Sequence, residues 1–393
     1  MAPRRFDIVV FGATGYTGRL VTKYLAKKQT NSSEKFTWAI AGRSKSKLEE
    51  LKNSVGAPQL DILIANSEDS ASMEALCQDA VVVIGCAGPF GLYGMPLVDA
   101  CMKKGAHYVD ITGEFPFVRR VIEKYHSEAE SRGILIVPQC GFDSIPSDLG
   151  NYLVHDCCLK QFKTDPVSVE GYFKMAGGGG GSRGTLESIA HIVRTITPQD
   201  MSPVCLNPKD KRNVKTPVFL LPMYNFTLKC WSGPFLMAGT NEKTVRRTNA
   251  LNNSAASYCE GLRGNFLSIV LSTVVYYALY IIFILPVVRT LVKRLFPPPG
   301  EGPSEKAAMQ PFRAVFVGKT SNGDSATAVV SSEMGGYPAT AVFVAESALC
   351  IAHDIVAASA MTSVKGGVLT PMTALGSLLL PRLARNGIKF EVK

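Results

Sequence analysis

No stretch of this 393-residue sequence combines consecutive basic residues with interleaved aromatic residues, so a nucleic-acid partner is not expected. The ten cysteines include no C-x-x-C pair and no cysteine and histidine cluster at metal spacing, so no metal site is expected. Several cysteines lie in apolar runs, such as Cys86 in VVVIGCAG, which is typical of buried, reduced thiols inside cells. With 46% hydrophobic and only 19% charged residues, the composition excludes a disordered chain.

Basic residues outnumber acidic ones by 42 to 32, a formal net charge of +10 that suits an anionic cofactor or an anionic membrane surface. The first expected strand begins at Phe6, which leaves no room for a signal or transit peptide. We therefore expect an intracellular protein.

A glycine-rich turn follows the first apolar run. Residues 6–18 read FDIVVFGATGYTG, and the helix-like RLVTKYLAKK comes next, so the pattern predicts strand, turn and helix. Glycines let a pyrophosphate approach the amides at the helix N-terminus, although a glycine turn without a ligand remains the alternative. The residues predicted to hold the cofactor here are Gly12, Thr14, Gly15, Tyr16, Thr17 and Gly18.

The end of the second expected strand, FTWAIAGRS, favours NADPH over NADH. NAD-binding domains usually carry an acidic residue at this position for the ribose hydroxyls, whereas here Arg43 and Ser44 follow Gly42. Arg43 can pair with the 2′-phosphate of NADP, unless it is simply a solvated arginine that begins a surface helix. Later strand ends add three more predicted cofactor contacts: Asn66, Gly88 and Pro89.

Strand and helix patterns alternate through the first 150 residues. An apolar strand at 60–65 precedes a helix near 70–78. A further strand covers 80–88, and the strand-like segments HYVDITGE and ILIVPQCGFDS follow at regular intervals. This alternation predicts an α/β fold in which residues 1–150 form a doubly wound parallel sheet of the Rossmann type.

Ligands of such sheets lie beyond the carboxyl ends of the strands, where this sequence carries the loops GPFGLYG, DITGE and CGFDSIPSD. Candidates for proton transfer or substrate contact are Tyr93, Asp110, Glu114 and Asp143, with Tyr93 the first choice as acid and Asp143 the second. Alternatively, Asp143 belongs to an ordinary helix start, and Asp110 and Glu114 brace their loops.

These motifs together resemble one family. GATGYTG, AGRS, CAGPFGLYG, DITGE, CGFDSIPSDLG and the ending KGGVLTPMTALGSLLLPRLARNGIKFEV are similar, in this order, to the saccharopine dehydrogenase-like oxidoreductases, which also resemble trans-acting enoyl reductases. The resemblance covers most of the chain. It implies an NAD(P)-dependent oxidoreductase associated with lipid droplets, mitochondria or other membranes, with Gly12, Gly15, Gly18 and Arg43 at the cofactor.

The alternation fades after residue 150, which predicts a second, α+β domain from residues 151–262 and 310–393. Five glycines at 177–181 suggest a flap over the active site, a second anion cradle or a flexible connector. A helix is expected to start near Thr185, with one apolar face made of Leu186, Ile189, Val193 and Ile196.

Residues 263–296 interrupt this second domain. They contain an uncharged run at 264–288, long enough to cross a bilayer, followed by Arg289, Lys293 and Arg294. Three alternatives are open: membrane insertion without crossing, a true span, and a buried helix of a soluble protein. Two strands joined by an Asn322-Gly323 turn follow, and if they share a sheet with residues 160–245, a single span would separate its halves. Insertion without crossing is therefore favoured.

The sequence thus predicts a membrane- or lipid-droplet-associated NADPH-dependent oxidoreductase. Candidate substrates are a lipid-linked carbonyl, enoyl or imine in lipid or glycolipid metabolism, and the sequence does not choose among them. The alternative is a membrane protein that binds NADPH as a sensor or structural component without turning it over. A homo-oligomer is compatible with either function.

Overall fold

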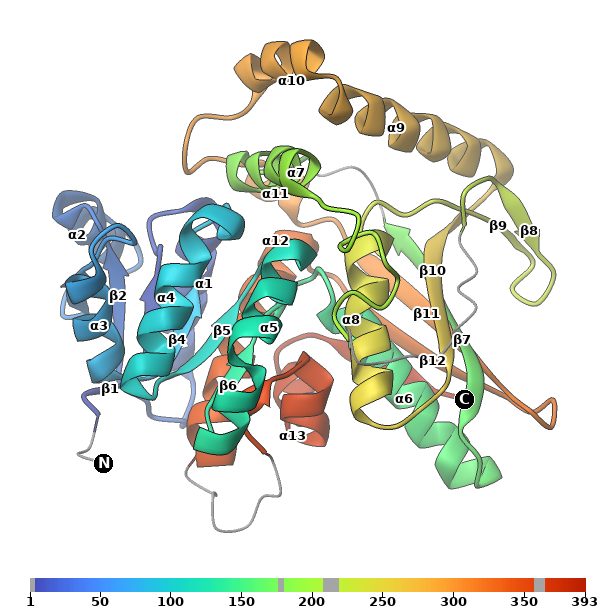
Figure 1. Ribbon diagram of the computed structural model, residues 1–393, viewed down its shortest axis with the longest axis horizontal. Coiled ribbons are helices and arrows are strands. Elements are labelled where there is room, and N and C mark those ends of the chain that lie inside the picture. The colour runs from blue at the N-terminus through green and yellow to red at the C-terminus, as the bar shows by residue number, and fades with distance from the viewer. Residues whose placement is uncertain (1–3, 176–179, 208–218, 357–364) are drawn as a thin grey trace.

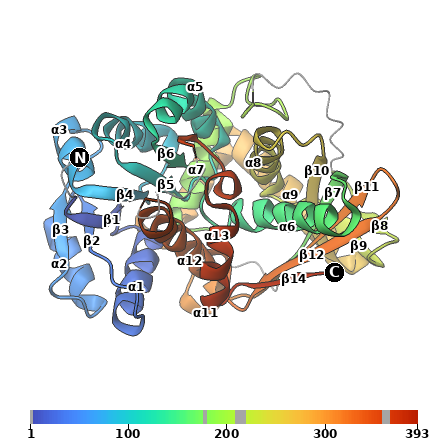
Figure 2. The same ribbon diagram turned by 90° about the horizontal axis from the view of Figure 1, so that it is seen from below.

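The computed structural model describes residues 4–175, 180–207, 219–356 and 365–393, which form two seven-stranded sheets (Figure 1). The sheets lie at opposite ends of the molecule; α12 and α13 lie between them in both views, and α6 runs from the middle of the molecule along the second sheet (Figures 1 and 2). Three of the predicted glycines, 177–179, fall outside the described residues.

The first sheet is parallel and has the order β13-β6-β5-β4-β1-β2-β3, so the prediction of a doubly wound sheet is confirmed. Its strands are β1 (Phe6–Phe11), β2 (Trp38–Gly42), β3 (Asp61–Ile64), β4 (Ala80–Gly85), β5 (His107–Asp110), β6 (Leu135–Val137) and β13 (Gly367–Val368). The connecting helices are α1 (Tyr16–Asn31), α2 (Lys45–Ser54), α3 (Ser70–Asp79), α4 (Phe90–Lys104) and α5 (Phe115–Arg132).

The second sheet has the order β14-β12-β11-β7-β10-β9-β8. Its strands are β7 (Pro166–Met175), β8 (Met223–Asn225), β9 (Cys230–Gly233), β10 (Ser257–Gly264), β11 (Phe312–Thr320), β12 (Ser325–Ser332) and β14 (Lys389–Val392). Strand β7 pairs with β10 on one side and with β11 on the other. The strands that flank the hydrophobic segment therefore share one sheet, as the sequence predicted.

Three long elements join the two sheets into one core. They are α6 (Ile145–Phe162), α12 (Gly336–Leu349), which continues as a π-helix (Cys350–Val356), and α13 (Pro371–Arg385). Apolar side chains from both sheets and from these helices form a single buried cluster, for example Ile8, Phe316 and Phe343. Helix α12 carries apolar residues on all sides, as a fully buried helix does.

The predicted domain boundaries differ from the structure in two places. The boundary at residue 150 falls inside α6, a helix that packs on strands of the second sheet. The segment 310–393 does not belong to the second domain alone, since β13 extends the first sheet beside β6 and α12 packs on α1. The contacts of β13 and α12 join residues more than 200 positions apart, so local sequence patterns do not indicate them.

Two helices of the second domain approach the first sheet. They are α7 (Arg183–Thr195) and α8 (Ala238–Leu251). The predicted apolar face of α7 is confirmed for Leu186, Ile189 and Val193, which pack around Phe283 and Phe296. Ile196 was placed wrongly on this face: it follows the end of the helix and packs against the core of the first domain.

The hydrophobic segment forms α9 (Phe266–Ile284), α10 (Pro286–Val292) and a short 3-10 turn (Lys293–Leu295), and α11 (Glu305–Ala308) follows. Figure 1 shows α9 and α10 along one edge of the molecule, above α7. Within the described residues, α9 and the helix Gly336–Val356 are long and apolar enough to cross a membrane by length and composition. The second is 83% buried and is a core helix, whereas only 17% of the α9 window is buried.

Candidate active site

The glycine-rich loop between β1 and α1 lies very close to the backbone of neighbouring segments. Gly12 has a φ of +79°, and a Cβ added there would lie 2.7 Å from the Ala87 nitrogen. A Cβ at Gly18 would lie 2.3 Å from the Gly12 carbonyl oxygen. Glycine is therefore required at both positions, the first for the turn and the second for packing the helix against it.

The N-terminus of α1 fits a phosphate group. Its N-cap is Gly15, which offers no side-chain acceptor, and among the described residues no acceptor bonds the amides of Tyr16, Thr17 and Gly18. Unpaired amides at a helix start attract an anion. The side chain of Tyr16 points elsewhere, since its hydroxyl donates a hydrogen bond of 2.8 Å to the Pro303 carbonyl, and the predicted contact is therefore through the backbone.

Arg43 and Ser44 lie at the carboxyl end of β2, as predicted. Arg43 is exposed and has no ion pair or hydrogen bond within the described part of the chain. Ser44 is the N-cap of α2, and its hydroxyl lies 3.2 Å from that of Ser46, leaving the helix start without a side-chain cap. A free guanidinium beside an uncapped helix start can receive a 2′-phosphate.

Asn66 follows β3, next to β2 in the sheet. Its side-chain oxygen accepts a bond from the Glu68 amide at 3.3 Å, so it shapes its own loop, and cofactor contact stays a prediction. Gly88 and Pro89 lie between β4 and α4, where a Cβ on Gly88 would come within 3.6 Å of the Ser188 hydroxyl.

Two of the candidate carboxylates brace loops. The buried Glu114 accepts bonds from the amides of Phe90 (2.6 Å) and Gly91 (3.0 Å), so it caps α4 from a neighbouring loop. The buried Asp110 accepts bonds from the Thr112 and Gln139 amides and from the Tyr108 hydroxyl. Burial raises the pKa of Asp110 to about 6, while those three bonds oppose the rise. The bracing alternative is therefore the one that the structure shows for both.

Asp143 differs from these two carboxylates. Its Oδ1 is buried and has no hydrogen-bond partner in the described structure. A Cβ added at Gly113 would lie 3.3 Å from its Oδ2, so the glycine leaves room for the carboxyl at the end of β5. Burial raises the pKa of Asp143 to about 6. An unpaired carboxyl that titrates near neutral pH at this edge of the sheet is suited to proton transfer.

The loop that carries Asp143 is strained. Gln139 and Ser144 are buried non-glycine residues with φ of +64° and +106°. Ser144 is the N-cap of α6, and no side-chain hydrogen bond caps this helix, so Asp143 does not serve its start. Such backbone conformations are costly and cluster at functional sites, which agrees with a substrate-facing loop.

Tyr93 lies in the first turn of α4 with 39% of its surface exposed. Within the described residues its hydroxyl has no hydrogen-bond partner. The structure therefore gives Tyr93 an open surface position, in contrast to Asp143 with its buried Oδ1. The role of Tyr93 as acid is untested, and Asp143 is the better placed of the two candidates.

Sequence reasoning missed the residues that the second domain contributes to this edge. The α7 hydroxyl of Ser188 donates a 2.7 Å bond to Glu114, and a Cβ at Gly91 would lie 2.4 Å from the His191 Nε2. The α8 hydroxyl of Thr240 donates a 2.9 Å bond to the Gly113 carbonyl. No sequence motif identifies these residues, because they lie on ordinary amphipathic or polar helices.

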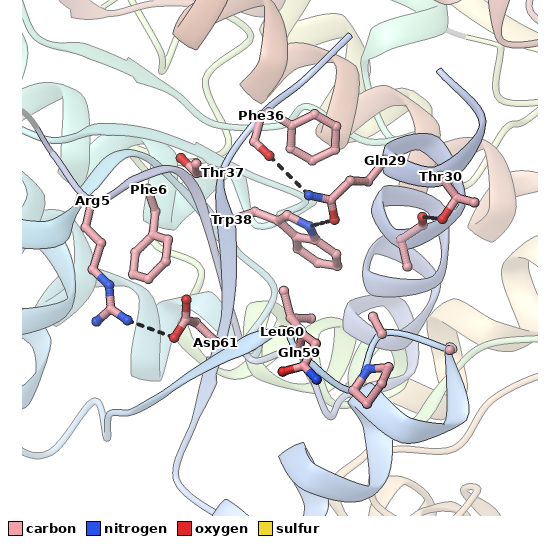
Figure 3. A pocket seen from close by; sticks show the side chains of 14 residues that line it. Arg5, Phe6, Gln29, Thr30, Phe36, Thr37, Trp38, Gln59, Leu60 and Asp61 are labelled. Atoms are coloured by element: carbon pink, nitrogen blue, oxygen red, sulfur yellow. Dashed lines mark hydrogen bonds and ion pairs between the residues drawn. The ribbon is translucent and has the colours of Figure 1, made fainter. Parts of the chain in front are cut away.

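A pocket lies at the other edge of the first sheet (Figure 3). It has a volume of about 560 Å³ and is bordered by the starts of β1, β2 and β3, for example at Phe6, Trp38 and Asp61. Arg5 pairs with Asp61 there, and Trp38 donates to Gln29. Because the glycine loop follows the opposite ends of these strands, this pocket is separate from the cofactor site.

Comparisons with known proteins agree with this geometry. The saccharopine dehydrogenase NADP binding domain family matches residues 8–137. A trans-acting enoyl reductase of Mycobacterium ulcerans is 30% identical over 98% of this chain and 97% of its own length. A Mycobacterium tuberculosis protein that is also named as a trans-acting enoyl reductase is 32% identical over 99% of this chain and 98% of its own length.

A solved structure shares the fold. Saccharopine dehydrogenase (L-Glu forming) of Saccharomyces cerevisiae superimposes with a TM-score of 0.57, covering 98% of this chain and 99% of that chain at 11% identity. The Rossmann sheet and the phosphate loop thus belong to an NADP(H)-binding oxidoreductase. The chain is a member of the saccharopine dehydrogenase-like oxidoreductase family, with trans-acting enoyl reductases among its relatives.

Proposed function

We propose that this protein is an NADPH-dependent reductase that works on the surface of an intracellular membrane or lipid droplet and reduces a lipid-linked carbonyl, enoyl or imine. The carboxyl of Asp143, whose Oδ1 is buried without a partner in the described structure at the same strand edge as the phosphate loop, is the observation that carries the catalytic part. Bound NADPH would supply the hydride.

Residues of the chain bind the cofactor, donate the proton and close the site. The backbone amides at the start of α1 hold the pyrophosphate, and Arg43 holds the 2′-phosphate. Asp143, in its protonated form, donates a proton to the substrate atom that gains negative charge as hydride arrives. The α7 and α8 helices close the site from the side of the second domain, through Ser188 and Thr240.

Membrane contact is supported by the outward face of α9. Leu267, Leu271, Val274 and Ile281 are 56–74% exposed, whereas the helix buries Ile269, Thr273 and Phe283. A surface helix of a soluble protein normally presents polar side chains on such a face. Because β10 and β11 both pair with β7, the helix is proposed to lie in the interface without separating the two halves of the sheet.

The helix is also connected to the cofactor loop. The chain after α10 passes the start of α1, where Tyr16 bonds Pro303 and Arg19 bonds the Gly300 carbonyl. On the other side, α7 lies against α9 through the cluster around Phe283 and reaches Glu114 through Ser188. A lipid held at α9 would therefore lie next to the helix that closes the catalytic edge.

Incubation of the purified protein with NADPH and a lipid extract tests the proposal. We expect cofactor oxidation that depends on the extract and is lost in Asp143→Asn while NADPH binding remains. Asp61→Asn, at an exposed carboxylate on the opposite edge, is the matched control and should keep the rate. Tight NADPH binding with no oxidation in any extract would instead support the alternative, a sensor or structural protein.

A further inference from the structure

A second pocket lies where β10 leads into α9. Its volume is about 480 Å³, and it is lined by Lys174, Met175, Cys230, Arg263, Gly264, Asn265 and Ser268. In Figure 1 this is the end of α9 that lies above β10 and β7. Among the described residues, two cations line it and no carboxylate does, so its lining suits an anion.

The strand register brings the cations together. Phe173 of β7 is level with Leu262 of the parallel strand β10, so Lys174 and Arg263, the next residues, lie side by side on the other face of the sheet. Lys174 is also directly opposite Arg313 of β11. Three positive side chains therefore form one row across three adjacent strands.

This row is only partly neutralised. Arg313 lies 3.7 Å from Glu391, whereas Lys174 and Arg263 have no hydrogen bond or ion pair in the described part of the chain. Like charges directly opposite each other on a sheet are destabilising. A bound anion would remove that repulsion.

The apolar surface beside the pocket indicates where the anion comes from. Phe266 and Leu267, in the first turn of α9, are 54% and 74% exposed, and Leu271 continues the same surface. Apolar side chains next to a cationic pocket match a lipid, whose phosphate and acyl chains lie at successive depths. We propose that this pocket binds the phosphate of a lipid headgroup, and this inference rests on the membrane contact proposed above.

The lining also selects among headgroups. Choline, serine and ethanolamine headgroups carry an ammonium group, which Lys174 and Arg263 would repel and which no carboxylate in the described lining could receive. A phosphate monoester presents its charge without an ammonium group. The expected ligand is therefore a lipid with an exposed phosphate monoester, for which phosphatidic acid is the simplest probe.

Vesicle flotation of the full chain tests the lipid preference. Phosphatidylcholine vesicles are prepared with added phosphatidic acid or phosphatidylserine and matched in zeta potential. The protein should bind the vesicles with phosphatidic acid at least about tenfold more tightly than those with phosphatidylserine. The double variant Lys174→Gln, Arg263→Gln should lose this ratio. Arg294→Gln, at the far end of the segment, should weaken binding to both anionic vesicles about fivefold and keep the ratio, because it removes one cation near the surface.

Alkylation of Cys230 gives a second readout that needs no enzyme activity. Cys230 lines the pocket and is half-buried, so mass spectrometry can follow the alkylation of its thiol. Phosphatidic acid vesicles should slow this alkylation more than phosphatidylcholine vesicles do, and the double variant should lose the difference.

The outcomes separate the possibilities. Equal protection of Cys230 by millimolar inorganic phosphate, with no vesicle preference, would overturn the lipid assignment in favour of a soluble phosphate ligand. Binding to phosphatidylcholine without any preference for phosphatidic acid would overturn the pocket and leave the proposed membrane contact intact. Absence of binding to every vesicle would overturn both.

Discussion

Asp143 links the catalytic proposal to a measurable stability effect. In the folded protein, burial raises the pKa of its carboxyl from 3.8 to about 6. The folded state therefore keeps the proton at pH values where the unfolded chain has lost it, and ionisation of Asp143 destabilises the fold as pH rises. At about 1.4 kcal/mol per pKa unit, the full effect is roughly 3 kcal/mol.

The Asp143→Asn variant isolates this effect, since asparagine does not titrate and the fixed cost of burying its amide does not vary with pH. We expect the stability of wild type relative to the variant to fall by roughly 3 kcal/mol between pH 3 and pH 8, with most of the change between pH 4 and pH 6. Urea unfolding followed by circular dichroism at a series of pH values measures it.

Asp61→Asn is the control substitution for this comparison, because Asp61 is half-exposed and pairs with Arg5 at the surface. A flat profile for Asp143→Asn would refute the reasoning, as would wild type gaining stability relative to this variant with rising pH. The latter result would mean that the ionised carboxyl has a partner and is a structural group.

Three further predictions concern the cofactor, the acid and the membrane. Arg43→Asp should weaken NADPH binding at least about tenfold more than NADH binding in fluorescence titrations, and an equal loss of both would remove Arg43 from the 2′-phosphate site. Tyr93→Phe should keep kcat within about twofold, because its hydroxyl is exposed and unpartnered in the described structure, whereas a large drop in kcat with unchanged NADPH affinity would make Tyr93 the acid. Replacing 264–288 by a short polar linker should give a protein that stays in solution without detergent and still binds NADPH. In the intact chain, thiol labelling of Cys230 and of a cysteine placed at Ser321 should show both sites on the same side of the membrane. Labelling from opposite sides would instead support a true span.

The parts of the fold that local sequence determines were predictable. The strand, glycine turn and helix from Phe6 onward follow from apolar alternation and from glycines whose conformation no other residue adopts readily. The pairing of β11 and β12 followed from their turn, which has Gly323 at a φ of +90°. The exposed α9 was recognisable as an apolar run, but only the structure shows which of its faces is buried.

The buried polar helix α8 illustrates what the sequence conceals. Its residues TNEKTVRRTNAL are mostly polar or charged, yet Asn241, Glu242 and Arg246 are buried. Asn241 donates to Glu260, and Arg246 donates to the Tyr258 carbonyl. Burial of these groups depends on partners in β10, so no pattern within the helix could reveal it.

The contrast among the three acidic candidates has the same cause. Asp110, Glu114 and Asp143 all follow predicted strands, and their sequence contexts are equally rich in glycine and polar residues. Only the tertiary structure shows that backbone amides satisfy the first two and that no described group satisfies the third. Assigning the acid therefore required the positions of the neighbouring loops.

Transfer of deuterium from NADPH labelled at the reactive carbon of the nicotinamide tests the central claim most directly. The purified protein would be incubated with the labelled cofactor and a lipid extract, and the lipids analysed by mass spectrometry. The account predicts a lipid product one mass unit heavier than that formed with unlabelled NADPH, absent with Asp143→Asn and present with Asp61→Asn. Recovery of the labelled cofactor unchanged from a protein that binds it tightly would contradict the account.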